Sequence, residues 1–117
     1  RYQFGQPLNC LIKVVIDEKA IGDKKAEGLI YDLSPRGLKC SCPLDLPENK
    51  DNLMLEVGFV LNDEPILIRG EIRWKKPYGT NFLYGLLIEK DHDLQDLIIR
   101  ELKLYSKNAS QKSRTFT

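Results

Sequence analysis

The residues best suited to recognise a ligand lie in one short stretch, residues 31–38, which has the sequence YDLSPRGL. Asp32 and Ser34 have short polar side chains that hydrogen-bond to a nearby backbone or to a ligand. Arg36 can offer its planar guanidinium to a phosphate, and Asp32 can accept hydrogen bonds from the N–H groups of a purine. Gly37 permits a positive φ or the close approach of another group. This spacing predicts a turn that binds an anionic or purine-containing ligand.

Side chains that could catalyse a reaction do not gather anywhere in the sequence. His92 is the one histidine, and it stands between two aspartates with no nucleophile nearby, so we expect it on the surface. The chain has no glycine-rich phosphate loop and no repeated metal-ligand spacing. Cys40 and Cys42 form a CxC pair without clustered histidines, and Cys10 makes the number of cysteines odd, which argues against a zinc site. We expect a non-enzymatic binding module with no cofactor and no metal.

The charge and length of the chain limit its partners. The 18 basic side chains are balanced by 17 acidic ones, so the broad positive field of a nucleic-acid-binding protein is missing. No apolar run approaches the ~20 residues that cross a bilayer, and the start has no signal-peptide core. The cysteines are expected to be packed, free thiols, which indicates a reducing compartment. We therefore expect a cytoplasmic domain that binds no DNA or RNA and does not insert into a membrane.

Apolar residues that alternate with period two predict six strands. The first carries five inward residues: Leu8, Cys10, Ile12, Val14 and Ile16. The predicted strands cover residues 8–16, 28–33, 38–42, 53–61, 66–75 and 81–89. A mobile turn is expected at residues 17–27, and the fourth and fifth strands are expected to form a hairpin. Several short strands without helices between them favour a closed antiparallel barrel.

After residue 90 the apolar period becomes helical. One stripe contains Leu94, Leu97, Ile98, Leu102 and Tyr105. Asp91 or Asp93 can cap the first amides of this helix, which is expected to cover an end or a flank of the barrel. Residues 107–117 are polar and aperiodic, so we expect a domain at residues 1–106 followed by a disordered tail, or a tail that only a partner orders.

The stretch at residues 31–38 resembles the DxSxxG signature of PilZ domains, with Asp32, Ser34 and Gly37 at the signature positions. WKKPYGTNFLYGLLI, residues 74–88, is similar to the last strand pair of that family, and the resemblance covers nearly the whole chain. It implies a six-stranded PilZ-like barrel that binds cyclic di-GMP. It also implies an output in motility or in exopolysaccharide and biofilm control, through a protein partner or an adjoining domain.

The second PilZ signature, RxxxR, lies about 20 to 30 residues before the aspartate and binds guanine and phosphate in ligand-bound members. Arg1 resembles its second arginine, because YQFGQPL follows it, and the first arginine would then precede this chain. In the alternative alignment Arg1 is the first arginine, and Gly5 breaks the motif. A guanidinium suits this role because it can donate two parallel hydrogen bonds to guanine or phosphate and can stack on a purine.

Trp74 has two open interpretations. Alternation with Ile72 puts it on the inward face of its strand, which favours packing in the core. The resemblance offers the other interpretation, because in some PilZ domains a tryptophan near this strand packs against a ligand guanine. Arg69 and Arg73 alternate to the outer face, where a solvated surface is expected, although Arg73 could reach a phosphate.

Two other functions compete with a cyclic di-GMP sensor. A PilZ-like adaptor would have lost ligand binding and would act through protein contacts, which an incomplete arginine pair supports. An oligonucleotide-binding barrel would need a basic groove with exposed aromatic platforms, and the balanced charge and core-like aromatic residues argue against it.

Overall fold

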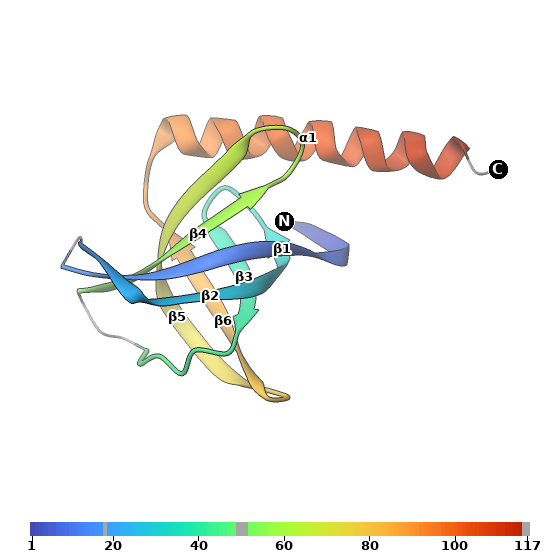
Figure 1. Ribbon diagram of the computed structural model, residues 1–117. Coiled ribbons are helices and arrows are strands. Elements are labelled where there is room, and N and C mark those ends of the chain that lie inside the picture. The colour runs from blue at the N-terminus through green and yellow to red at the C-terminus, as the bar shows by residue number, and fades with distance from the viewer. Residues whose placement is uncertain (18, 49–51, 116–117) are drawn as a thin grey trace.

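Six strands and one helix make up the part of the chain that the computed structural model describes, residues 1–17, 19–48 and 52–115 (Figure 1). The elements are β1 (Tyr2–Ile16), β2 (Lys19–Leu33), β3 (Gly37–Cys42), β4 (Leu53–Val60), β5 (Pro65–Tyr78), β6 (Asn81–Ile88) and α1 (His92–Thr115). The strands pair antiparallel in the order β1-β2-β3-β6-β5-β4, and β1 also pairs with β4 to close the barrel. The predicted six-stranded antiparallel barrel with a C-terminal helix is confirmed.

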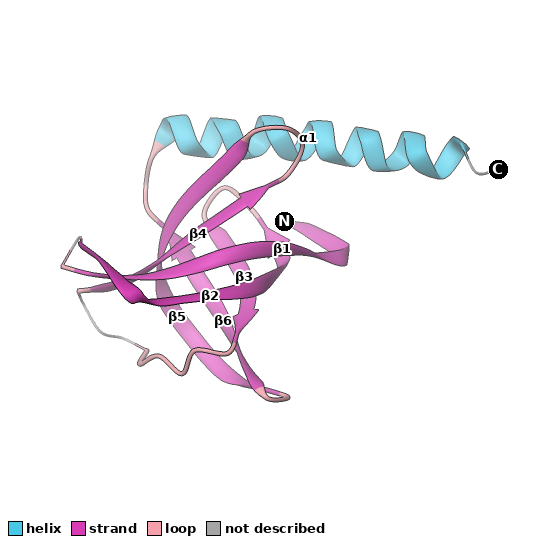
Figure 2. Ribbon diagram, viewed as in Figure 1, coloured by secondary structure: helices cyan, strands magenta, loops and turns pink. Residues whose placement is uncertain are grey.

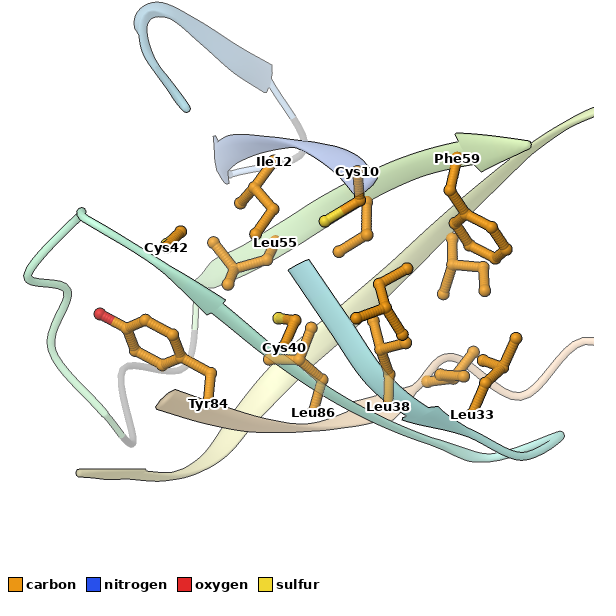
Figure 3. Packing of buried hydrophobic residues seen from close by; sticks show 14 of the residues in the cluster. Cys10, Ile12, Leu33, Leu38, Cys40, Cys42, Leu55, Phe59, Tyr84 and Leu86 are labelled. Carbon is orange, nitrogen blue, oxygen red and sulfur yellow. The ribbon is translucent and has the colours of Figure 1, made fainter. Parts of the chain in front are cut away.

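The barrel interior is filled by the residues that strand alternation turns inward (Figure 3). Ile12, Leu55 and Tyr84 are fully buried there. The Tyr84 hydroxyl donates to the carbonyl oxygen of Leu44 and accepts a 2.9 Å hydrogen bond from the backbone N–H of Leu46. The core therefore also fastens the loop that follows β3.

The three cysteines are part of this core. Cys10, Cys40 and Cys42 are buried and free, and Figure 3 shows them among aliphatic side chains. Burial raises the pKa of the Cys10 thiol to about 12 and the pKa of Cys40 well above its ordinary value. The interpretation of these residues as packed thiols is confirmed.

Helix α1 lies across one end of the barrel and extends beyond it (Figures 1 and 2). Ile98 is fully buried against the barrel, and the predicted apolar stripe packs around it. The cap is Asp91, because its Oδ1 accepts a 3.1 Å hydrogen bond from the backbone N–H of Leu94.

The first hairpin is longer than the sequence indicated. The prediction of a mobile turn at residues 17–27 is wrong, because β2 already begins at Lys19. β1 and β2 pair regularly out to Lys13 and Lys25 and, after a register shift, pair again at Val15 with Ala20 and at Ile16 with Lys19. The chain reverses at Asp17, whose φ of 52° is in the left-handed region. Backbone pairing needs no buried side chain, so it continues where the apolar alternation stops.

Helix α1 is also longer than expected, since it continues through residues 107–115, where the sequence indicated a disordered tail. Once a helix has been nucleated, each added residue gains a hydrogen bond for one further pair of fixed dihedrals. Residues 116 and 117 lie outside the described part of the chain. The division into a domain at residues 1–106 and a tail at residues 107–117 stays a prediction, although the helix crosses that boundary.

Candidate ligand-binding site

A bulge in β2 turns Asp32 to the outer face of the barrel. Ile30 pairs with Cys40, but the next pair is Asp32 with Lys39, so Tyr31 is an extra residue. Side chains alternate between the faces of a strand, and one extra residue reverses the alternation beyond it. Asp32 would otherwise follow Ile30 into the core. The bulge instead places its carboxylate beside Lys39.

A second bulge, in β5, does the same for Trp74. Ile72 pairs with Leu86 and Trp74 with Gly85, which leaves Arg73 as the extra residue. Trp74 is 38% exposed, and its indole lies so close over Gly85 that a Cβ added there would overlap the ring. The interpretation of Trp74 as a core residue is therefore wrong, because the alternation that supported it is interrupted one residue earlier.

Between β3, β6 and β5 the outer face has a cavity of about 190 Å³. Four of the six predicted site residues line it: Arg1, Arg36, Gly37 and Trp74. Two further cations, Lys39 and Arg73, line it as well. The surface residue Arg73 thus faces the cavity, where it also pairs with Glu71 at 3.0 Å. The cavity combines positive charge with an exposed aromatic ring.

The Asp32 carboxylate adjoins this cavity and is 3% exposed. Its Oδ1 lies 3.4 Å from Nη1 of Arg1, and its Oδ2 lies 3.5 Å from Nζ of Lys39. Within residues 1–17, 19–48 and 52–115, no group donates a hydrogen bond to the buried Oδ1. A buried acceptor without a hydrogen bond costs ~1–3 kcal/mol, so Asp32 can gain free energy from a donor that a ligand supplies.

Ser34 and Gly37 form the turn that carries the signature. The backbone N–H of Ser34 donates to the carbonyl oxygen of Gly37 at 2.8 Å, and Ser34 Oγ donates to the same oxygen at 3.4 Å. Ser34 therefore braces the turn and does not line the cavity. Gly37 serves close approach, because a Cβ added there would overlap the Arg1 guanidinium. The Arg1 guanidinium thus packs against Gly37 and lies beside the Asp32 carboxylate.

Arg36 has both a structural contact and a place at the cavity. Its Nε donates a 3.0 Å hydrogen bond to the carbonyl oxygen of Ile88, the last residue of β6. The backbone N–H of Ile88 in turn donates to the carbonyl oxygen of Arg36 at 3.0 Å. These bonds fix the signature turn to the strand that leads into α1.

The start of β1 positions Arg1. Tyr2 pairs with Leu33 of β2 and Gln3 with Asp32, and the ladder then breaks until Leu8. Tyr2, Phe4 and Tyr105 of α1 form an edge-to-face aromatic cluster, with ring centroids 5.0 to 5.8 Å apart. Arg1 is therefore connected to α1 through the next residue of the chain.

Lys39 and Gly85 are the site residues that the sequence analysis missed. Alternation from Leu38 and Cys40 already indicated an outward side chain at Lys39. Its place beside Trp74 depends on the pairing of β3 with β6 and of β6 with β5, which joins segments far apart in the chain. Gly85 carried no local signal, because its role is to leave room for an indole from another strand.

A comparison with known protein families identifies the family of this chain. The PilZ domain family model matches residues 6–105. The chain belongs to the PilZ domain family. Members of this family are receptor modules for cyclic di-GMP. Arg1 precedes the matched residues, so its role as a signature arginine stays a prediction.

The PilZ fold is also seen in a solved structure. The crystal structure of the PilZ domain of CeSA from a cellulose-synthesizing bacterium is similar, with a TM-score of 0.52 and 14% sequence identity. The alignment covers 86% of this chain and 93% of that chain, and at this identity it shows the fold alone. No curated protein matches the chain.

Two classes of feature are not found in the described residues. None of their helices is long and apolar enough to span a bilayer. The same part of the chain has no group of three or more His, Cys, Asp or Glu side chains placed to hold a metal ion.

Proposed function

We propose that this PilZ domain is a non-enzymatic cytoplasmic sensor that binds cyclic di-GMP at the cavity between β3, β6 and β5. It passes the level of this second messenger to a protein partner or an adjoining domain in motility or in exopolysaccharide and biofilm control. Of the proposed site residues, Arg1, Arg36, Gly37 and Trp74 line the cavity, Asp32 adjoins it, and Ser34 braces the turn that contains Gly37. One observation carries the proposal: the two bulges bring a buried carboxylate with an unused acceptor to the same face as an exposed indole and several cations.

The chemistry of cyclic di-GMP matches these groups. A guanine has N–H donors for the Asp32 carboxylate and two acceptors, O6 and N7, for a guanidinium. Its flat face can stack on the Trp74 indole, and such base stacking is worth ~1–3 kcal/mol. The two phosphates are anions that Arg1 and Arg36 can bind through charge-assisted hydrogen bonds.

The size of the cavity indicates how much of the ligand it holds. Its volume of about 190 Å³ is below the ~300–1,000 Å³ of typical enclosed ligand sites. It therefore accommodates one base, and the rest of the dinucleotide lies over the outer face of the barrel. The Arg1 side chain, which is 51% exposed, can move to meet it.

The N-terminal segment supplies a route for the signal. In the free protein the Arg1 guanidinium lies 3.4 Å from Oδ1 of Asp32, so a ligand donor that approaches this oxygen competes with Arg1 for it. Tyr2 follows Arg1 and packs against Tyr105 of α1. A ligand shifts a conformational equilibrium through its different affinity for the two states, and the position of Arg1 creates that difference.

Titration tests this function directly. Cyclic di-GMP, but not GTP or cyclic AMP, is expected to raise the melting temperature, because binding to the folded state stabilises it by mass action. It should also change the fluorescence of Trp74, the single tryptophan. A melting temperature that stays unchanged at millimolar ligand would favour the adaptor, and a response to single-stranded DNA would favour an oligonucleotide-binding barrel.

Asp32→Ala gives this titration a site-specific variant. We expect its affinity for cyclic di-GMP to fall about tenfold to a hundredfold, since a hydrogen bond to a charged group is worth ~1.5–3 kcal/mol. The matched control is Glu27→Ala, which removes an exposed carboxylate from the same strand, β2, at a position that does not line the cavity. Both variants should keep the far-ultraviolet circular dichroism of the barrel. Loss of folding in Asp32→Ala alone would make Asp32 a structural residue.

A further inference from the structure

Four residues of the site form one row across the outer face of the barrel. Asp32 of β2 pairs with Lys39 of β3, Lys39 pairs with Gly85 of β6, and Gly85 pairs with Trp74 of β5. Neighbouring strands lie ~4.8 Å apart, so the row brings an acceptor, a donor and an aromatic platform together in that order. The indole covers the glycine, which moves the platform next to Lys39.

Lys39 lies between the carboxylate and the platform. Its Nζ is 3.5 Å from Oδ2 of Asp32, its side chain is 36% exposed, and it lines the cavity. A base that stacks on Trp74 with one edge toward Asp32 must therefore pass beside the Lys39 ammonium. The edge of the base therefore meets two adjacent groups. The Lys39 ammonium only donates hydrogen bonds, and the Asp32 carboxylate accepts them.

We infer that Lys39, paired with Asp32, makes the site select guanine over adenine, an inference that rests on the proposed function. The base-pairing edge of guanine has the acceptor O6 beside N–H donors, which complements Lys39 beside Asp32. Adenine has the opposite arrangement, an amino donor beside a ring-nitrogen acceptor. Its amino group would face the ammonium and its ring nitrogen would face the carboxylate.

The burial of Asp32 strengthens this selection. A site that is built to hydrogen-bond one ligand rejects an analogue strongly when its own buried polar groups are left unpaired. Asp32 is such a group, because Oδ1 accepts no hydrogen bond from the described residues. Lys39 supplies the other half of the pattern, so the selection depends on its charge and donors.

Binding of cyclic di-GMP and cyclic di-AMP to the parent chain and to Lys39→Met tests the inference. Methionine keeps an unbranched apolar stem but has no donor and no charge. We expect Lys39→Met to lose about tenfold to a hundredfold in affinity for cyclic di-GMP and to lose at least about tenfold of the preference for it over cyclic di-AMP. Lys39→Arg should retain the preference. The control is Lys103→Met, which removes the same charge from an exposed position on α1 and should change neither affinity.

The possible results separate the inference from the proposed function. A parent chain that binds neither dinucleotide overturns the proposed function and this inference together. A parent chain that binds both equally overturns the inference alone, because it still binds cyclic di-GMP but does not select guanine. A parent that prefers cyclic di-GMP, with Lys39→Met keeping the full preference, overturns the role of Lys39 alone. An equal loss of affinity for both dinucleotides also overturns it, because it would make Lys39 a general anion contact or a neutralising partner of Asp32.

Discussion

Two hollows that described residues line on the outer face of the barrel differ in size and in chemistry. The larger one, of about 560 Å³, lies over β1, β2 and β4, and its lining contains Asn9, Leu11, Glu27 and Gly58. The smaller one, of about 190 Å³, has four cations and the Trp74 indole in its lining and the buried Asp32 beside it. Volume would point to the first hollow, and hydrogen-bonding and charge complementarity point to the second. The second is the better candidate because polar groups that converge on one point orient a ligand.

The strands beneath the two hollows explain this difference. β1 pairs with β4 without a register shift, and β1 pairs with β2 regularly from Leu8 to Lys13, the stretch that lies beneath the larger hollow. The side chains there follow plain alternation. The smaller hollow is bordered by the bulges at Tyr31 and Arg73, which turn two further side chains outward. Bulges re-aim side chains next to functional sites in many proteins, and here they concentrate the polar and aromatic groups on one side.

The largest effect is expected from Gly85→Ala in the smaller hollow, and Gly58→Ala in the larger hollow is its control. In Gly85→Ala the new Cβ would overlap the Trp74 indole and displace it, so cyclic di-GMP should lose the stacking contact and bind about 5-fold to 150-fold more weakly. In Gly58→Ala the new Cβ would lie 3.4 Å from Cδ1 of Leu67, an ordinary contact. Calorimetric titration should show that Gly58→Ala binds as the parent does. Equal affinities of Gly85→Ala and the parent would remove Trp74 from the site.

A smaller loss of affinity is expected from substitutions at Arg1 and at Gly37, which Arg1 contacts. Arg1→Ala should lower the affinity for cyclic di-GMP about tenfold, since the contact is charge-assisted but half exposed. Gly37→Ala should cause a similar loss, because its Cβ would take the place of the guanidinium.

The double variant checks whether these two losses have one cause. If Gly37 acts through Arg1, the combined loss will be smaller than the sum of the two free-energy changes. Additive losses would show that Gly37 supports the ligand in another way. A parent-like affinity of Arg1→Ala would exclude Arg1 from the site.

The smallest effect concerns Cys10, which contributes to the wall of the larger hollow. Burial raises the pKa of its thiol from 9.0 to about 12, so the unfolded chain loses this proton at a lower pH than the folded chain does. Its contribution to stability is complete below pH 9 and decreases as the pH rises from 9 towards 12. Urea unfolding under reducing conditions at about pH 8 and about pH 10.5 measures the loss.

Cys10→Ala isolates this contribution, because Cys40, Cys42 and Tyr84 also have raised pKa values and act in the same direction. The variant should lose less stability than the parent over this pH interval. Identical losses of stability in the two proteins would show that ionisation of Cys10 does not contribute to the loss of stability at alkaline pH. Cys10 does not line the smaller hollow, so Cys10→Ala should bind cyclic di-GMP as the parent does.

Local patterns in the sequence predicted most of the architecture. The inward residues of β1, β4 and β6 follow plain alternation, and the stripe around Ile98 follows the helical period. The turn that contains Asp32 and Gly37 was recognisable from residue types and spacing. These features depend on neighbours within a few positions of the chain, so the sequence contains enough information to predict them.

The sequence by itself determined the barrel, the closing helix and the residue types of the signature turn. Tertiary structure decided the faces on which Asp32 and Trp74 lie, because an extra residue in a strand is defined only against the partner strand that it fails to match. It also decided that Lys39 and Gly85 join the site, since β3, β6 and β5 become neighbours only when the barrel closes. A binding site assembled across strands depends on register, and register is a property of pairs of strands that no single segment of the sequence contains.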